Sequence, residues 1–221
     1  NPNNPTATNG TDQAWGGNRA RPDLVKKFFP NGNIPNLESY ATAEAAGDDR
    51  ALFNGVNRTL DNDDVATFKS GFGVAKFTNF KTDGSAGHDA TFPDADFFLM
   101  RAAEAYLNFA EADARINGGQ TTKEGTEAIN AIRKRANASP REDKGYSLND
   151  ICDEWSREFY FEGRRRMDLI RFNRFGGNVN YNWQWKGGTK EGRNFSKDLN
   201  IFAIPTNELT SNKNLTQNPG Y

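Results

Sequence analysis

The sequence predicts a mainly α-helical protein built from helix pairs, with long loops and little β structure. Apolar residues recur at helical spacing through residues 96–174, and glycines interrupt the pattern where one helix would turn into the next. Residues 1–95 are instead rich in Asn, Gly, Asp and Pro, and residues 175–221 return to a loop-like composition. We therefore expect a helical scaffold over 96–174, preceded by a loop-rich segment that forms a candidate ligand face and followed by one that closes on the scaffold.

The first helix pair is predicted between residues 96 and 136. Two glycines at 118–119 end its first helix, and a capping box of Thr121 and Glu124 opens the second. A pair of about 40 residues is close in length to the helix-turn-helix repeats that stack into solenoids. Six residues of the first helix, mostly small ones that let another helix approach, are expected on one face: Leu99, Ala102, Ala103, Tyr106, Ala110 and Ala114.

Residues 146–174 supply the next pair, and residues 151–174 within them are the stretch around which the chain is organised. Ile151, Trp155 and Phe159 recur at i, i+4 and i+8, and Gly163 separates this run from a second one. Charged groups next to a buried stripe need partners. We therefore predict a structural ion-pair network among four residues: Glu158, Glu162, Arg164 and Asp168.

The same carboxylates allow a catalytic alternative. Glu158 and Glu162 lie one helical turn apart and could serve as the acid pair of a glycoside hydrolase. The abundant arginines nearby would keep both groups ionised rather than raise a pKa. A non-catalytic role is therefore the prediction.

Shorter elements are expected outside these pairs. A helix is predicted over 22–29, with Pro22 in its first turn and Pro30 after its end. Residues 74–80 have the pattern of a strand. Residues 198–204 are expected to be extended, and the rest of the chain to Tyr221 to consist of turns.

Composition narrows the possible functions. A formal net charge of −1 gives no basic field for nucleic acid. One cysteine, Cys152, excludes an intrachain disulfide, and a lone His88 offers no histidine pair for a metal, so neither metal nor cofactor is expected. No stretch approaches the roughly 18 to 20 apolar residues of a membrane span. Because residues 1–10 look like the middle of a loop, we expect a piece of a longer protein.

Two groups of loop aromatics are candidates for ligand binding. Trp15 lies next to two glycines, with Asn18 and Arg19 as hydrogen-bond donors beside it. This tryptophan either folds back on the core or forms a platform for a sugar ring. A second group contains Tyr181, Trp183 and Trp185, whose two tryptophans would share one face of an extended segment. Its alternative is packing against the helices or a partner.

Five ordered blocks between residues 97 and 221 resemble the carboxy-terminal half of the SusD/RagB family. They read FFLMRAAEAYLNFAEADARINGG, EAINAIRKRAN, EFYFEGRRRMDLIRF, FAIPTNEL and LTQNPGY. Three earlier blocks, WGGNRARPDLVKKFF, DDRALF and VAKFTN, are similar to the part of the family that precedes them.

The resemblance implies a fold, a function and a location. It implies tetratricopeptide-like helix pairs in an α-α superhelix, with the ligand held in loops. It implies a non-catalytic lipoprotein at the outer face of the outer membrane, anchored through an amino-terminal lipid that this chain lacks. Such a protein binds polysaccharides or oligosaccharides, or peptides in some members, and works with a SusC-like TonB-dependent transporter. The missing amino-terminal half of the same protein is a further expected partner.

Overall fold

The computed structural model describes residues 8–12 and 17–221, and its secondary structure confirms the predicted fold class. Within the described residues the α-helices are α1 (Pro22–Lys26), α2 (Ser39–Ala46), α3 (Ala102–Ile116), α4 (Lys123–Arg135), α5 (Leu148–Phe159), α6 (Arg165–Arg171) and α7 (Thr206–Ser211). The strands are β1 (Arg19–Ala20), β2 (Phe53–Asn54) and β3 (Phe72–Val74), and short 3-10 helices are η1 (Thr8–Gly10), η2 (Lys186–Gly188) and η3 (Lys197–Asn200).

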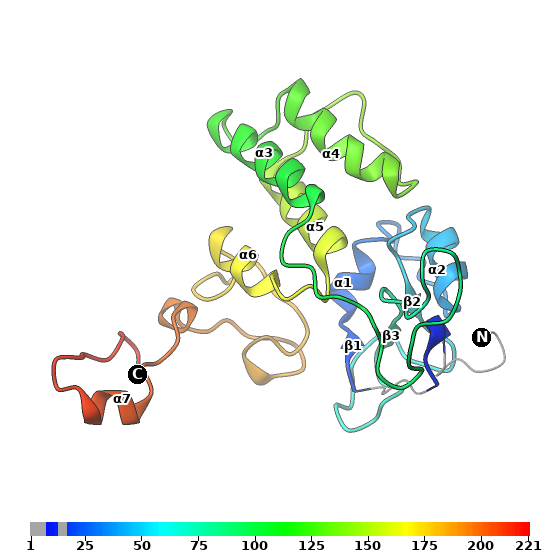
Figure 1. The fold of residues 1–221 in the computed structure, drawn as a ribbon. Coiled ribbons are helices and arrows are strands. Elements are labelled where there is room, and N and C mark those ends of the chain that lie inside the picture. The colour runs from blue at the N-terminus through cyan, green and yellow to red at the C-terminus, as the bar shows by residue number, and fades with distance from the viewer. Residues whose placement is uncertain (1–7, 13–16) are drawn as a thin grey trace. The chain divides into compact units, whose positions relative to one another are not determined.

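The chain forms two compact units, residues 1–162 and 163–221 (Figure 1). The division falls between α5 and α6, next to Gly163, whose positive φ of 77° is readily adopted by glycine. It therefore separates the two helices of the second predicted pair.

One hydrophobic cluster of the first unit lies between a small antiparallel sheet and helices α1 and α2. The strand order is β1-β3-β2, with Phe53 opposite Val74. The ring of Phe53 lies 5.5 Å from that of Phe28 in an edge-on contact and 5.3 Å from that of Tyr160. Since Tyr160 directly follows α5, these ring contacts fasten the end of α5 to the sheet.

The predicted strand over 74–80 is wrong beyond its first residue. β3 ends at Val74, and one further backbone hydrogen bond joins the amide of Ala75 to the carbonyl of Leu52. The amine of Lys76 then donates to the carbonyl oxygen of Glu158 at 2.9 Å. This contact ties the chain after β3 to the end of α5, so the ladder does not continue.

Helix α3 packs against α4 and α5, and its buried face is partly the predicted one. Ala103, Ala110 and Ala114 are buried as predicted, together with Leu107 and Glu111. Leu99 and Tyr106 were predicted on the same face but are 85% and 47% exposed, and Ala102 is exposed as well. The helix begins only at Ala102, since the preceding residue is extended in the backbone, so it starts later than the periodicity predicted.

The capping box that initiates a helix lies on α5. The hydroxyl of Ser147 accepts from the amide of Asp150 at 3.2 Å, and the Asp150 carboxylate accepts from the amide of Ser147 at 2.9 Å. The box predicted from Thr121 is wrong, since Thr122 is the N-cap of α4. Asp113 of α3 accepts from the Thr122 amide at 2.7 Å, so the end of one helix orients the start of the next.

In the second unit, α6 is followed by loops with η2 and η3. The predicted extended segment over 198–204 is partly wrong, because η3 takes up its first residues. Helix α7, which begins after Pro205, was not predicted. The terminal segment folds back on residues 201–204, where Gln217 exchanges two hydrogen bonds with the backbone of Ile204 at 2.8 and 2.9 Å.

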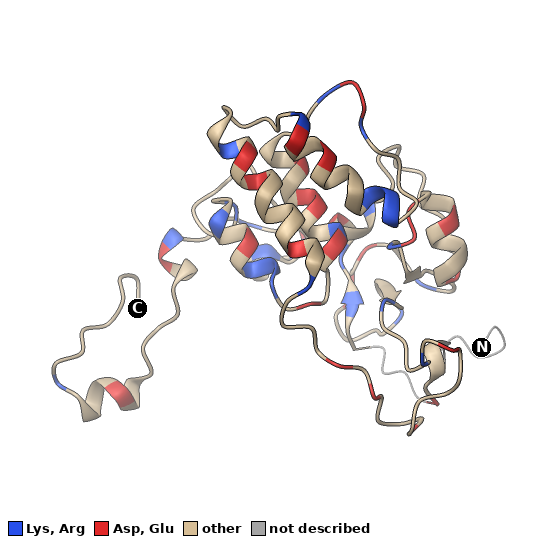
Figure 2. Cartoon of the chain, turned by 45° about the horizontal axis from the view of Figure 1, so that its top comes forward, with Lys and Arg blue, Asp and Glu red and all other residues tan. Residues whose placement is uncertain are grey.

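Acidic and basic residues are mixed along the helices of both units (Figure 2). Among the described residues, no helix combines the length and the apolar character that crossing a membrane requires. The same residues contain no group of three or more side chains arranged to hold a metal ion.

Candidate functional site

Two carboxylates of α5, those of Glu154 and Glu158, are deeply buried in the first unit. Glu154 is 0% exposed and accepts hydrogen bonds from Arg50 at 2.8 Å and from Arg133 at 2.9 Å. Arg157, three residues later, binds it through Nε at 2.9 Å and Nη2 at 2.7 Å. Burial alone would raise the pKa of Glu154, but these arginines lower it to about 2. Glu154 is therefore an ionised structural group.

Glu158 and Glu162 are held in the same way. Glu158 is 2% exposed, and Arg50 and Arg135 donate to it at 3.0 and 2.8 Å. Arg101 binds both carboxylates: it contacts Glu158, and its Nε lies 2.8 Å from Oε2 of Glu162. Burial opposes ionisation, yet the basic partners hold the pKa of both carboxyls below the ordinary value. The pair does not provide the protonated acid on which a glycoside hydrolase depends.

The four residues predicted to pair with one another fall into two groups. Arg164 and Asp168 contact each other, with 3.5 Å between Nε and Oδ2. Glu158 and Glu162 are joined through a residue outside the predicted set, Arg101. Helical spacing could not reveal this partner, because it lies 57 residues before Glu158.

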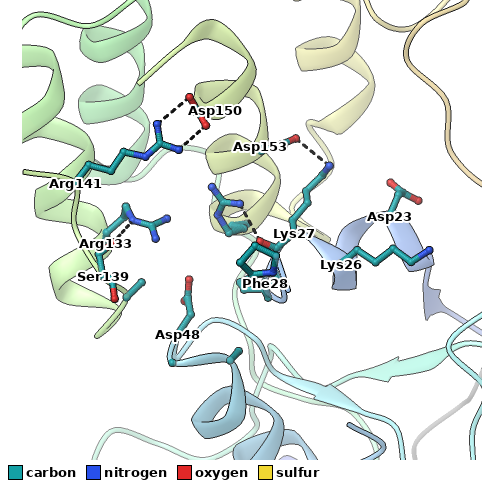
Figure 3. A pocket seen from close by; sticks show the side chains of 15 residues that line it. Asp23, Lys26, Lys27, Phe28, Asp48, Arg133, Ser139, Arg141, Asp150 and Asp153 are labelled. Atoms are coloured by element: carbon teal, nitrogen blue, oxygen red, sulfur yellow. Dashed lines mark hydrogen bonds and ion pairs between the residues drawn. The ribbon is translucent and has the colours of Figure 1, made fainter. Parts of the chain in front are cut away.

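A polar cleft of about 540 Å³ lies beside the α5 network, lined by residues of α1, α4, α5 and the turn after α2 (Figure 3). Two pairs of its charged groups bind each other: Arg141 contacts both oxygens of Asp150 at 2.5 and 2.9 Å, and Lys27 lies 2.9 Å from Asp153. Its aromatic residue, Phe28, is only 4% exposed. Because a sugar needs an accessible ring face for its C–H groups, this cleft is a poor saccharide site.

The first predicted aromatic group is described only in part. Trp15 lies outside the described residues, whereas Asn18 is exposed just before β1. The guanidinium of Arg19 donates to the carbonyls of Val65 at 2.8 Å and Ser70 at 3.1 Å, and also to that of Thr67. Arg19 therefore fixes the loop over residues 65–70 against β1.

The second aromatic group forms a cluster in the second unit. Trp183 stacks on Phe175, with 6.1 Å between ring centroids and 20° between planes, and lies edge-on to Tyr181 at 6.3 Å. Arg165 donates to the hydroxyl of Tyr181 at 2.6 Å. The predicted extended segment is wrong here, because Trp185 has a φ of 68° and sits in a turn. The two tryptophans therefore do not share one face of an extended segment, as was predicted.

A cavity of about 680 Å³ adjoins this cluster. Arg166 lies at its wall, with its guanidinium carbon 5.1 Å from the Phe175 ring and 4.0 Å from the Phe202 ring. Phe202 is 71% exposed and Tyr221 is 52% exposed, so two ring faces are accessible. Asn194 also lines the cavity and is exposed. The lining thus combines rings with guanidinium and amide donors.

One feature of the sequence indicates the residues of this cavity, which the site prediction did not include. Arg166 lies in the block EFYFEGRRRMDLIRF, Phe202 in FAIPTNEL and Tyr221 in LTQNPGY. All three blocks carry the family resemblance. The predicted ligand site was instead based on the loop tryptophans and did not include residues of these blocks. Nothing in their spacing indicates that they meet, since Phe202 lies 36 residues after Arg166 and in a different block.

Comparison with known proteins decides the family. Residues 39–221 match the model of the SusD family. The chain belongs to the SusD family. It is also 37% identical to the starch-binding protein SusD of Bacteroides thetaiotaomicron. The alignment is 243 positions long and covers 96% of this chain and 43% of that protein. The resemblance predicted from the sequence is therefore confirmed, and the chain spans less than half the length of this curated relative.

Solved SusD-like structures show the same fold. A SusD-like protein of Bacteroides fragilis superposes with a TM-score of 0.61 at 21% identity, over 98% of this chain and 49% of that one. A laminarin-binding SusD-like protein gives a TM-score of 0.54 at 22% identity, over 96% of this chain and 40% of the other. At these identities the comparison establishes the helical SusD fold alone.

Proposed function

We propose that this chain is the part of a cell-surface SusD-family protein that binds a polysaccharide or oligosaccharide without cleaving it. The observation that carries the proposal is the 37% identity, along 96% of the chain, to a relative named for starch binding. The bound glycan would pass to a SusC-like TonB-dependent transporter in the outer membrane. A lipid anchor outside this chain would hold the protein at the outer face.

The chemistry of the described residues supports a binding role. Glu158 and Glu162 are kept ionised by basic partners, which argues against acid catalysis at the pair with the best spacing. The second unit offers exposed rings beside donors such as Asn194. A sugar can place its C–H face on a ring and its hydroxyls against amides and guanidinium groups.

We propose two contact regions for the glycan. In the first unit Trp15 would form the platform and Asn18 a donor, while Arg19 holds the loop over residues 65–70 against β1. In the second unit the aromatic cluster of Tyr181, Trp183 and Trp185 would contribute, with the cavity next to it. The ion pairs of Glu158, Glu162, Arg164 and Asp168 would serve the scaffold.

Retardation in native gels that contain starch, levan, xylan, mannan or pectin tests this function. We expect one polysaccharide to slow the protein, and Trp15→Ala or Asn18→Ala to reduce that retardation at least fivefold. Asn33→Ala is the matched control, because Asn33 is another exposed amide of the first unit. Its retardation should equal that of the unchanged chain.

Two results would overturn the proposal. Release of reducing sugar that Glu158→Gln abolishes would establish a hydrolase. Absence of retardation by every polysaccharide, together with saturable binding of peptides, would favour the peptide-binding alternative within the family.

A further inference from the structure

The two units carry opposite net charges. Residues 163–221 contain ten Lys and Arg and four Asp and Glu, so the second unit has a formal net charge of +6. Residues 1–162 contain 18 Lys and Arg and 25 Asp and Glu, which gives the first unit a formal net charge of −7. The total of −1 is therefore the sum of an acidic and a basic unit. A unit with so large an excess of one charge favours ligands of the opposite charge.

Two arginines of the second unit line its cavity of about 680 Å³ without a carboxylate beside them. These are Arg166 and Arg193, and none of the lining residues is an Asp or a Glu. The buried acid of this unit, Asp168, is bound instead by Arg164 and Arg171 at 3.5 and 2.9 Å. The positive charge at the cavity is therefore not neutralised from within the second unit.

Both arginines are held by backbone carbonyls and keep further N–H donors for a ligand. Nε of Arg193 donates to the carbonyl of Gly187 at 3.1 Å, and its two terminal nitrogens donate to none of the described residues. Nη2 of Arg166 donates to the carbonyls of Leu199 at 3.3 Å and Asn200 at 2.9 Å, which leaves its Nε and Nη1 without an acceptor among the described residues. A planar guanidinium group binds a carboxylate through two parallel N–H donors.

The rings of the same cavity indicate that a sugar carries the anion. Phe202 and Tyr221 are 71% and 52% exposed, and Asn194 adds an exposed amide. A small inorganic anion makes no use of ring faces, whereas a pyranose can place its C–H face on one of them and its hydroxyls against the amide. The volume of about 680 Å³ lies within the range of small-molecule sites.

We propose that this cavity binds a uronic acid residue of the glycan, with its carboxylate on Arg193 and its ring face on Phe202. Arg166 positions the Phe202 ring, with its guanidinium carbon 4.0 Å from the ring centroid, and adds a second positive charge. This inference rests on the proposed glycan-binding function and specifies its substrate class as acidic polysaccharides. A neutral glycan would leave both guanidinium charges uncompensated in a unit of net charge +6.

A matched pair of ligands tests the proposal. Oligogalacturonate and its methyl ester have the same rings and hydroxyls, but only the acid is charged. We expect isothermal titration calorimetry to give a Kd at least tenfold lower for the acid than for the ester. Arg193→Gln keeps a hydrogen-bond donor and removes the charge, so it should weaken binding of the acid at least tenfold and binding of the ester less than twofold. Oligomannuronate and its ester serve as a second pair.

The control variant is Lys213→Gln, which removes the same charge from the second unit. Lys213 is exposed and does not line the cavity, so its substitution should change the Kd of the acid less than twofold. Raising NaCl from about 20 mM to about 300 mM should weaken binding of the acid, because salt screens exposed charges, and this dependence should be smaller in Arg193→Gln. Equal salt dependence in the two chains would overturn the role assigned to the Arg193 charge.

The remaining outcomes separate this inference from the proposed function. Equal affinity for acid and ester, a preference for acid that Arg193→Gln leaves intact, or binding of starch alone would overturn the uronate site and leave glycan binding standing. Absence of binding to both acids and to every neutral polysaccharide would overturn both proposals. Binding to anionic phospholipid vesicles that Arg193→Gln abolishes, without binding of either acid, would assign the arginines to a membrane surface and overturn the uronate site.

Discussion

Arginines contact different groups around α5 in the first unit and beside the cavity of the second unit. Around α5 they surround buried carboxylates, as Arg50 does when it contacts both Glu154 and Glu158. In the second unit Arg166 lies over the rings of Phe175 and Phe202 and donates to the backbone carbonyl of Asn200 at 2.9 Å. Around α5 the guanidinium charge is neutralised by buried carboxylates, whereas in the second unit the guanidinium group orients rings at a surface.

We expect the first set of contacts to determine the free energy of unfolding and the second to affect ligand binding. A buried carboxylate whose partner is lost leaves an uncompensated charge, so the α5 network should dominate the free energy of unfolding. An exposed ring held by a cation contributes little to folding but remains available to a ligand. Substitutions in the two regions should therefore affect different measurements.

The largest effect is expected at Glu154. Glu154→Gln removes the negative charge that balances three arginines, and should lower the free energy of unfolding by about 3 to 5 kcal/mol. Urea unfolding followed by circular dichroism measures this change. Glu127→Gln is the matched control on a glutamate whose side chain is 65% exposed, and it should leave the unfolding midpoint unchanged. Equal midpoints for the two variants would show that the network does not stabilise the fold.

Acid should remove the same stabilisation. Because the pKa of Glu154 is about 2 in the folded chain and near its ordinary value of 4.5 in the unfolded chain, its contribution is complete above about pH 5. It falls as pH decreases toward 2, by about 3 kcal/mol in total for this group. Urea midpoints between pH 6 and pH 3 measure the slope, which should be shallower in Glu154→Gln. A slope unchanged by the substitution would contradict the assignment.

Local sequence patterns predicted the helical scaffold because its determinants are close in sequence. The i, i+4, i+8 spacing of Ile151, Trp155 and Phe159 placed α5 correctly, and all three residues are buried. The predicted start of α3 and the predicted cap of α4 were wrong, whereas α3 ends before Gly118 and Gly119 as predicted. Both depend on contacts between segments, such as the one from Asp113 to Thr122, and propensity does not contain them.

The partners of the buried charges could not be predicted for the same reason. Glu154 binds Arg50 across 104 residues of sequence, and only the fold brings the two together. In the second unit, loop composition singled out Tyr181, Trp183 and Trp185 as candidate ligand contacts, which stays a prediction. It did not indicate the turn at Trp185 or the approach of Phe202 to Arg166, which depend on how the loops close.

A smaller loss of stability is expected at Trp155. Its indole N–H donates to the carboxylate of Glu111 at 3.0 Å, and both side chains are buried. Trp155→Phe keeps an aromatic ring but removes the donor to an ionised group, so unfolding should become easier by about 1.5 to 3 kcal/mol. Urea unfolding again provides the measurement. Trp183→Phe is the control, and a loss as large as that of Trp155→Phe would remove the contrast between the units.

The smallest effect on stability, and the sharpest test of the comparison, is expected at Phe202. Its ring is 71% exposed above Arg166, so Phe202→Ala should change the free energy of unfolding by less than about 0.5 kcal/mol. If the cavity takes part in glycan binding, the same substitution should reduce retardation by the bound polysaccharide at least threefold. Val179→Ala serves as the control, because Val179 is 76% exposed in the same unit and does not line the cavity.

The two measurements on Phe202→Ala give different answers for different roles of the ring. A marked loss of stability without a change in retardation would make Phe202 a structural residue and would place the glycan elsewhere, with Trp15 as the remaining platform. A loss of retardation at unchanged stability would mean that Arg166 orients the ring for a ligand. In that case the arginines around α5 stabilise the fold, whereas Arg166 serves recognition.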